Sequence, residues 1–151
     1  MPDISAYLKT KVHYNRTQEV ISELLEKRGI TEIRFSQNIN QIMLEFNYPL
    51  KQQNKTFKMG VRFVLDFPQS DNDKQRQQYR NQYYRALYYM LKSKFEAVEF
   101  GIREFGQEFL GDLVYQLPNG KTATIAEIIS PQVEKSITEG TSEVLMLPDQ
   151  T

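Results

Sequence analysis

The feature that most constrains this chain is a run of apolar residues spaced alternately four and three positions apart. The run consists of Tyr84, Tyr88, Leu91, Phe95, Val98, Ile102, Phe105 and Phe109. Such spacing is the heptad seam of an α-helix, and it predicts one long helix over residues 73–109, about 55 Å at 1.5 Å per residue. Because this helix would take about a quarter of the 151 residues, we expect the rest of the fold to pack along it.

The charge of the predicted helix changes sign halfway. Residues 74–95 contain six basic side chains and no acid, whereas residues 96–112 contain five acids and one base. The helix macrodipole favours the opposite order by about 0.3–1 kcal/mol per well-placed charge. The asymmetry extends to the whole chain, with net charge +7 over residues 1–95 and −7 over residues 96–151.

Three interpretations of this asymmetry stay open. It can provide a basic surface for an anionic partner, or it can drive head-to-tail association of copies. Alternatively, the charges are scattered over opposite faces of one domain. We expect a homo-oligomer, because the apolar arc of the long helix is too wide for one sheet contact; the N-terminal helix and the C-terminal appendage are the alternatives that could cover the rest of the arc. Gly101 and Gly106 indicate either close approach of another backbone or a bend in the helix.

Residues before the long helix show one further helical pattern and a β-sheet pattern. Residues 17–28 place apolar side chains on one stripe; Asn15 or Thr17 can cap this helix, and Gly29 can end it. Three later segments read as antiparallel strands, with a polar hairpin loop at 49–56, and Lys58 and Arg62 point outward. The predicted strands are residues 30–35, 41–48 and 57–67.

Residues after the long helix predict a small appendage. Residues 113–117 resemble a strand that is closed by a turn at Pro118-Asn119-Gly120. Thr124 and Glu127 can form the capping box of a short helix that ends at Ile129, before Pro131.

These elements predict a two-layer α+β fold. Its order is an N-terminal helix, a three-stranded antiparallel meander, one long helix and a small C-terminal β/α appendage. Residues 1–131 are expected to form a single domain. Residues 132–151 form a polar tail with one apolar island, Val144–Leu147; the tail is either docked through that island or disordered.

Several blocks of this sequence resemble a family of small uncharacterised proteins of phages and other mobile elements. They are KTKVHYNRTQEVISELLEKRGI, GVRFVLDFP, and the segment from QYYRALYYMLKSKFEAVEFGIREFG to PNGKTATIAEIISPQV. The centre of the long helix is the most specific block, whereas the loop Gln69–Lys74 is shorter than in many similar sequences. The resemblance implies a single-domain α+β protein in a phage or mobile-element setting, and it implies no reaction.

Composition offers little chemistry for catalysis. The chain has no Cys, and its one His, His13, has no sequence neighbours that would make it a positioned base. A Mg²⁺ ion could be bound by Glu96, Glu99 and Asp112, but helix surfaces often carry such acids without a metal. No glycine-rich phosphate loop is present. We therefore expect a non-enzymatic protein without catalytic, cofactor-binding or metal-binding residues.

The location predicted from the sequence is cytoplasmic. The start, MPDISAYLKTKVHYN, lacks the apolar core of a signal peptide, and no stretch approaches 18 consecutive apolar residues. We expect neither secretion nor a membrane partner.

The strongest candidate for a function is the basic, tyrosine-rich first half of the long helix. Basic side chains attract phosphates whatever the sequence, and exposed tyrosines can stack on bases. We predict a site for single- or double-stranded nucleic acid centred on Arg85, Tyr89 and Lys92, which Lys58 and Arg62 extend if the sheet face is open. The alternative is an assembly or anti-defence module that binds a host or phage protein through the long helix.

Lys94 lies off the polar side of the predicted helix. Helical projection places it near Tyr83, Leu87 and Gly101. A snorkelling or salt-bridged lysine accounts for this position, and an amine that contacts a ligand is the alternative.

Overall fold

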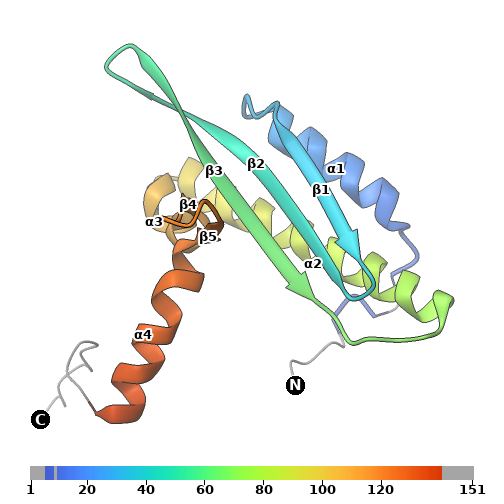
Figure 1. Ribbon diagram of the computed structural model, residues 1–151. Coiled ribbons are helices and arrows are strands. Elements are labelled where there is room, and N and C mark those ends of the chain that lie inside the picture. Colours follow the sequence, from blue (N-terminus) through green and yellow to red (C-terminus); the bar gives the residue numbers. More distant parts are fainter. Residues whose placement is uncertain (1–5, 9, 141–151) are drawn as a thin grey trace, which may run out of the picture.

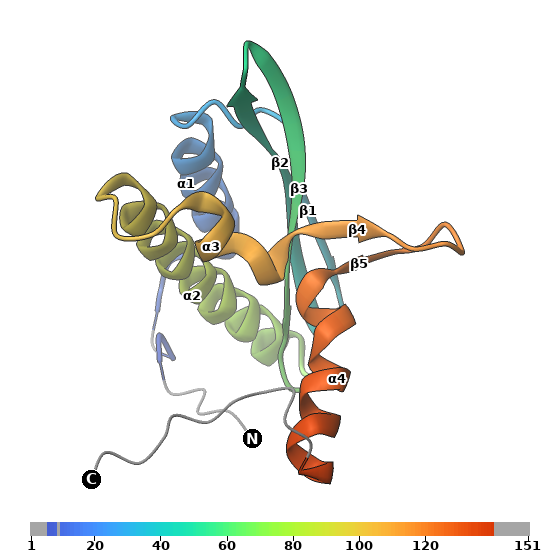
Figure 2. The ribbon, with the colours of Figure 1, turned by 90° about the vertical axis from the view of Figure 1, so that its left-hand side faces the viewer.

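The computed structural model describes residues 6–8 and 10–140 of the chain. It has the predicted α+β architecture, in which two helices pack on one face of a three-stranded antiparallel sheet (Figures 1 and 2). The sheet is a meander of β1 (Ile33–Asn38), β2 (Gln41–Gln52) and β3 (Lys55–Asp66), and the two packed helices are α1 (Tyr14–Glu26) and α2 (Asp73–Glu99).

The core lies between the sheet and these helices. Leu44 pairs in register with Phe35 on one side and with Phe63 on the other, so that apolar side chains alternate toward the helices as the sequence predicts. The central side chains are fully or almost fully buried: Ile21 and Leu25 of α1, Ile42, Leu44, Phe46, Val61 and Phe63 of the sheet, and Tyr84, Leu87, Leu91 and Phe95 of α2.

Helix α1 begins earlier than the sequence predicts. Its cap is His13 rather than Asn15 or Thr17, because the His13 Nδ1 atom accepts a hydrogen bond of 3.1 Å from the backbone amide of Asn15. The Tyr14 amide also donates to Asn81 Oδ1 on α2 at 2.8 Å, which ties the start of α1 to the other helix. Gly29, at φ +78°, follows the helix as expected.

The prediction of one helix over residues 73–109 is wrong. Helix α2 ends at Glu99, Gly101 has a left-handed φ of +75°, and a separate helix α3 (Phe105–Phe109) begins under a capping box between Glu104 and Gln107. Ile102 is consequently 74% exposed instead of buried in the seam. Phe105 and Phe109 still reach the core, because the turn brings α3 back against the sheet and the end of α2.

The prediction of a loop at 49–56 is also wrong, because both strands continue through it. The register runs to Gln52 opposite Lys55, and only Gln53 and Asn54 form the turn, with φ values of 49° and 63°. Two central residues with positive φ are the signature of the tight hairpin turn that matches the twist of β-strands. The sheet therefore carries a long two-stranded extension, seen at the upper left of Figure 1.

The C-terminal appendage starts with a 3₁₀ turn (Leu110–Asp112) and a short hairpin of β4 (Val114–Gln116) and β5 (Thr122–Thr124). Leu113 forms a bridge with Val61 at the edge of β3. Figure 2 shows this hairpin projecting from the sheet on the side away from α1 and α2.

Helix α4 (Ile125–Glu139) follows under the predicted capping box of Thr124 and Glu127. It does not end at Ile129 as predicted, because the helix continues through Pro131. Residues 132–139 of the predicted tail are thus helical, and Val144–Leu147 lie outside the described residues.

Candidate nucleic-acid interface

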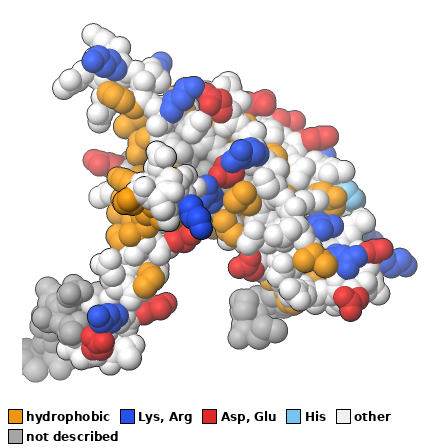
Figure 3. All heavy atoms as spheres, in the orientation of Figure 1, with side chains coloured by type: hydrophobic (Ala, Val, Ile, Leu, Met, Phe, Trp, Pro, Cys, Tyr) orange, Lys and Arg blue, Asp and Glu red, His pale blue; other side chains and the backbone are white. Residues whose placement is uncertain are grey.

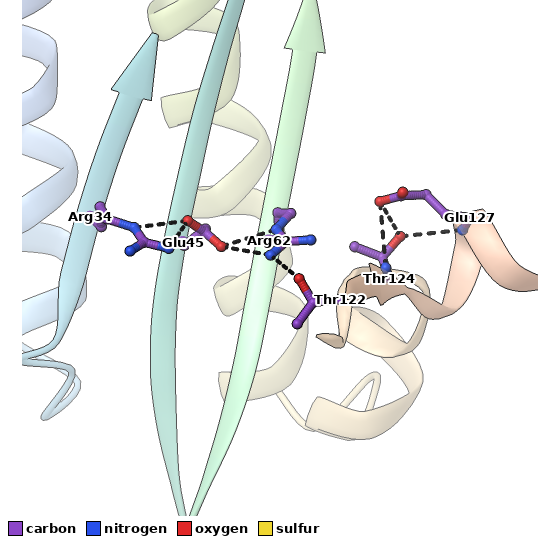
Figure 4. A network of polar contacts seen from close by, with 6 residues as sticks. All are labelled: Arg34, Glu45, Arg62, Thr122, Thr124 and Glu127. Carbon is purple, nitrogen blue, oxygen red and sulfur yellow. Dashed lines mark hydrogen bonds and ion pairs between the residues drawn. The ribbon is translucent and has the colours of Figure 1, made fainter. Parts of the chain in front are cut away.

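The sheet face away from the helices is organised around one acidic side chain, Glu45. Its carboxylate accepts hydrogen bonds from Arg34 Nε at 2.9 Å and from Arg62 Nε at 3.0 Å, and Arg62 Nη2 also donates to Thr122 Oγ1 of β5 at 2.8 Å (Figure 4). Burial on its own raises the pKa of Glu45, but the hydrogen bonds and charges of Arg34 and Arg62 outweigh it, and the pKa falls below its ordinary value.

Lys58 lies on the same face, two positions along β3 from Gly60 and four from Arg62. Its ammonium group binds the Glu32 carboxylate, which also accepts a hydrogen bond of 2.8 Å from Asn47 Nδ2. The hydrogen bond from Lys58, with that from Asn47, lowers the pKa of Glu32. The sequence prediction that Lys58 and Arg62 point outward is therefore right about the face, but both cations are paired with acids there.

The far end of the β2–β3 extension differs from this paired region. The arm is defined as residues 47–52 and 55–60 with the turn between them. It is the part of the β2–β3 hairpin that lies beyond the last residue of β2 that pairs with β1. Lys51 and Lys55 are exposed at its end, and neither forms an ion pair with any described residue. At this tip Figure 3 shows basic side chains and no acidic ones.

The second predicted group lies on the side of α2 that faces away from the sheet. Arg85 Nη2 donates to the Tyr89 hydroxyl at 3.1 Å, and its guanidinium lies 5.0 Å from the centre of the Tyr89 ring. Tyr89 is also stacked on Tyr7, with ring centres 5.4 Å apart and planes 12° apart. Lys92 lies 3.9 Å from the Glu96 carboxylate one turn further on.

These two groups of predicted residues do not form a single site. Arg85, Tyr89 and Lys92 lie on the helical layer, whereas Lys58 and Arg62 lie on the opposite side of the molecule, across the sheet. Within the helical group, the stacking partner Tyr7 already covers one face of the Tyr89 ring.

Lys94 is the salt-bridged lysine that the sequence suggests. Its ammonium group donates to the Glu108 carbonyl at 2.9 Å and lies 3.5 Å from the Glu108 carboxylate and 3.7 Å from that of Asp112. Burial raises the pKa of Asp112, and the positive charge of Lys94 opposes that rise only in part. These contacts tie α2 to α3 and the 3₁₀ turn.

Among the described residues, no three His, Cys, Asp or Glu side chains gather closely enough to hold a metal ion. His13 caps α1 and stacks on Tyr14, with ring centres 4.4 Å apart.

Sequence reasoning missed Lys51 and Lys55, the two cations at the tip. The prediction of a loop at 49–56 hid them, although the alternation Tyr48, Leu50 and then Phe57, Met59 continues on both sides of the turn. That alternation, together with the absence of acids from residue 46 to residue 65, was the signal available.

No protein-family profile, curated protein or solved structure matches this chain. None of the helices in the described part of the chain combines the length and the apolar character needed to cross a bilayer.

Proposed function

We propose that this protein binds nucleic acid without catalysing a reaction, as an accessory protein of a phage or other mobile element. The observation that carries the proposal is the charge of the arm and its base. The arm has three basic residues, Lys51, Lys55 and Lys58, and no acidic one, and it extends beyond the three-stranded part of the sheet; Arg62 lies at its base. The resemblance to phage and mobile-element proteins supports the biological setting.

The arrangement suits phosphates rather than a defined small anion. Lys51 and Lys55 are exposed and lie near each other along the ribbon, so that each can meet a phosphate without displacing an internal acid. Arg34, Lys58 and Arg62 already have acidic partners and would contribute less. Binding through such contacts releases counterions and weakens as salt increases.

The cluster of Arg85, Tyr89 and Lys92 is the second candidate surface for the same ligand. It ranks below the arm because Tyr89 is stacked on Tyr7 and because Lys92 lies near Glu96. Lys92 is nevertheless exposed and Arg85 is partly exposed, so that both can be compared with the lysines of the arm by charge reversal.

Two double variants with equal net charge separate the surfaces. Lys51→Glu/Lys55→Glu changes the arm, and Arg85→Glu/Lys92→Glu changes α2. We expect fluorescence anisotropy with labelled single- and double-stranded oligonucleotides at low salt to show a much larger loss for the arm variant. Equal losses would contradict the arm as the primary surface, and no binding by the parent protein at low salt would end the nucleic-acid proposal.

Binding of a host or phage protein is the second candidate function. It is favoured by exposed apolar side chains around a groove of about 440 Å³ beside α4, among them Leu110 and Ile129, which are 51% and 46% exposed. An apolar contact of this kind should respond little to salt, in contrast to phosphate binding. The salt dependence of the affinity for a captured partner therefore separates the two functions.

A further inference from the structure

The shape of the arm restricts which nucleic acid it can enter. Because β1 pairs with β2 only as far as Phe46, the arm is a two-stranded ribbon with six residues in each strand. At about 3.4 Å per residue its strands are about 20 Å long, and Tyr48 and Met59 near its base pack against the core. The two-residue turn at Gln53 and Asn54 adds no bulge, so the tip is no wider than the ribbon.

The two free lysines flank this ribbon on opposite faces. Lys51 is in register with Thr56, and Lys55 is the neighbour of Thr56 along β3. Successive residues of a strand point to opposite faces, and paired residues point to the same one. Lys51 and Lys55 are therefore on different faces, while the amide side chains of Gln52, Gln53 and Asn54 are exposed at the end between them.

We infer that the arm enters the major groove of double-stranded DNA, tip first; this inference rests on the proposed function. That groove is about 12 Å wide and admits a two-stranded ribbon, with phosphates along both walls. Lysines on opposite faces of the ribbon would then each face one wall. The amides at the tip would face the base edges, with which glutamine and asparagine form hydrogen bonds.

The other nucleic acids fit this arm less well. The major groove of A-form RNA is narrow and deep, so that a ribbon with side chains on both faces is excluded. Single strands are held mainly by base stacking on exposed aromatic side chains. On the arm only Phe57 provides one, at 50% exposed, since the Tyr48 ring is already stacked on Phe105 with centres 3.7 Å apart.

A shortened variant tests the inference without disturbing the core. Leu50 and Phe57 are register partners in phase with Gln52 and Lys55, the pair that closes the present turn. An Asn-Gly turn can therefore replace residues 51–56 and close the hairpin in the same register. Thermal unfolding checks that this variant folds. A second variant, Lys51→Ala/Lys55→Ala, keeps the whole arm, and its matched control is Lys121→Ala/Lys135→Ala, which removes two exposed lysines elsewhere.

The measurement is the affinity of the full chain for duplex DNA, duplex RNA and single-stranded DNA of one sequence and length. We expect duplex DNA to bind at least about tenfold tighter than the others, a difference of about 1.4 kcal/mol. The shortened variant and the Lys51/Lys55 variant should lose that preference, and the Lys121/Lys135 control should keep it. Methyl green, which occupies the major groove, should compete, and netropsin, which occupies the minor groove, should not.

Two different failures are distinguishable. The major-groove inference is overturned if salt-dependent binding is equally tight for the three nucleic acids, or if only netropsin displaces the DNA-bound protein. Either result leaves the proposed function standing. No binding of the parent protein to any of the three overturns the proposed function itself.

Discussion

At the scale of single residues, Glu45 is the acid that holds the outer sheet face together. Its carboxylate accepts hydrogen bonds from two arginines of the neighbouring strands, and Arg62 also donates to the Thr122 hydroxyl. The side chains of Glu45 and Arg62 are only 14% and 16% exposed, so this is a largely desolvated pair, unlike the exposed pairs elsewhere that contribute little. Removing one partner would leave the other charge without compensation.

We expect Glu45→Gln to lower the free energy of unfolding by about 1–3 kcal/mol at pH 7, because hydrogen bonds to charged groups are lost. Arg34 and Arg62 lower the folded-state pKa of Glu45, so its contribution is present above its unfolded pKa and disappears as pH falls through the folded pKa. Urea unfolding of both proteins between pH 7 and pH 3 should therefore show the difference shrinking toward acid.

The raised pKa of Asp112 acts in the opposite direction, since protonation there favours the folded state as pH falls. This effect of Asp112 is the same in the parent protein and in Glu45→Gln, so the difference between their stabilities reports on Glu45 alone. A difference that stays constant down to pH 3 would contradict the assigned role of the two arginines.

The seam of α2 gives a second prediction at this scale. Phe95 is 3% exposed and packs against Phe46 and Phe109, so Phe95→Ala should lower the free energy of unfolding by about 3–5 kcal/mol. Ile102 follows Phe95 in the same heptad pattern but is 74% exposed, and Ile102→Ala should change stability by less than about 0.5 kcal/mol. Equal losses of stability for Phe95→Ala and Ile102→Ala, in thermal or urea unfolding, would mean that the seam continues unbroken.

At the scale of elements, the break between α2 and α3 decides how the chain folds back on the sheet. Gly101 has a φ of +75°, and an added Cβ would meet nothing within 4 Å, so the backbone conformation alone requires glycine there. Gly101→Ala should therefore destabilise the protein by about 1–2 kcal/mol. In one continuous helix the same change would instead stabilise it by about 1 kcal/mol.

Gly106→Ala is the control for that experiment. Gly106 lies within α3, has no positive φ, and an added Cβ would again meet nothing within 4 Å. Alanine there should be neutral or stabilising by up to about 1 kcal/mol. Changes in the free energy of unfolding of opposite sign for the two variants support the break between α2 and α3. Changes of the same sign would contradict it.

Most elements could be predicted from local patterns. Alternation identified β2, β3 and their buried side, and the Thr124–Glu127 spacing identified the start of α4. The first strand was placed too early, because the predicted residues 30–35 overlap β1 only at residues 33–35. The heptad pattern failed at residues 100–104 because Phe105 and Phe109 are apolar for a different reason: α3 turns them back onto the core. Spacing records which residues are buried, and it does not record whether the backbone between them is continuous.

The candidate site was predictable only in part. Strand parity placed Lys58 and Arg62 on the outer face, but their pairing with Glu32 and Glu45 depends on cross-strand register, which one sequence does not specify. The stacking of Tyr7 on Tyr89 joins residues 82 positions apart, and no local pattern indicates it. Lys51 and Lys55 became visible only when the loop proved to be the tip of a ribbon.

At the scale of the whole molecule, the arm and α4 extend from the domain in different directions (Figure 1). The arm is basic, and the C-terminal part from residue 96 onward carries the net negative charge. We propose that copies associate in solution. Light scattering at tens of micromolar should report an oligomer at low salt, and its dissociation at high salt would assign the contact to opposite charges. A monomer at both salt concentrations would contradict self-association.

The most direct test of nucleic-acid binding by the arm is the salt dependence of affinity for duplex DNA. For the parent protein, log affinity should fall linearly with log salt concentration, and each phosphate contact should add about −0.9 to the slope. Lys51→Ala/Lys55→Ala should reduce that slope by about 1.8, since two phosphate contacts are lost. A slope unchanged by this variant, or no measurable binding by the parent protein at low salt, would contradict the account.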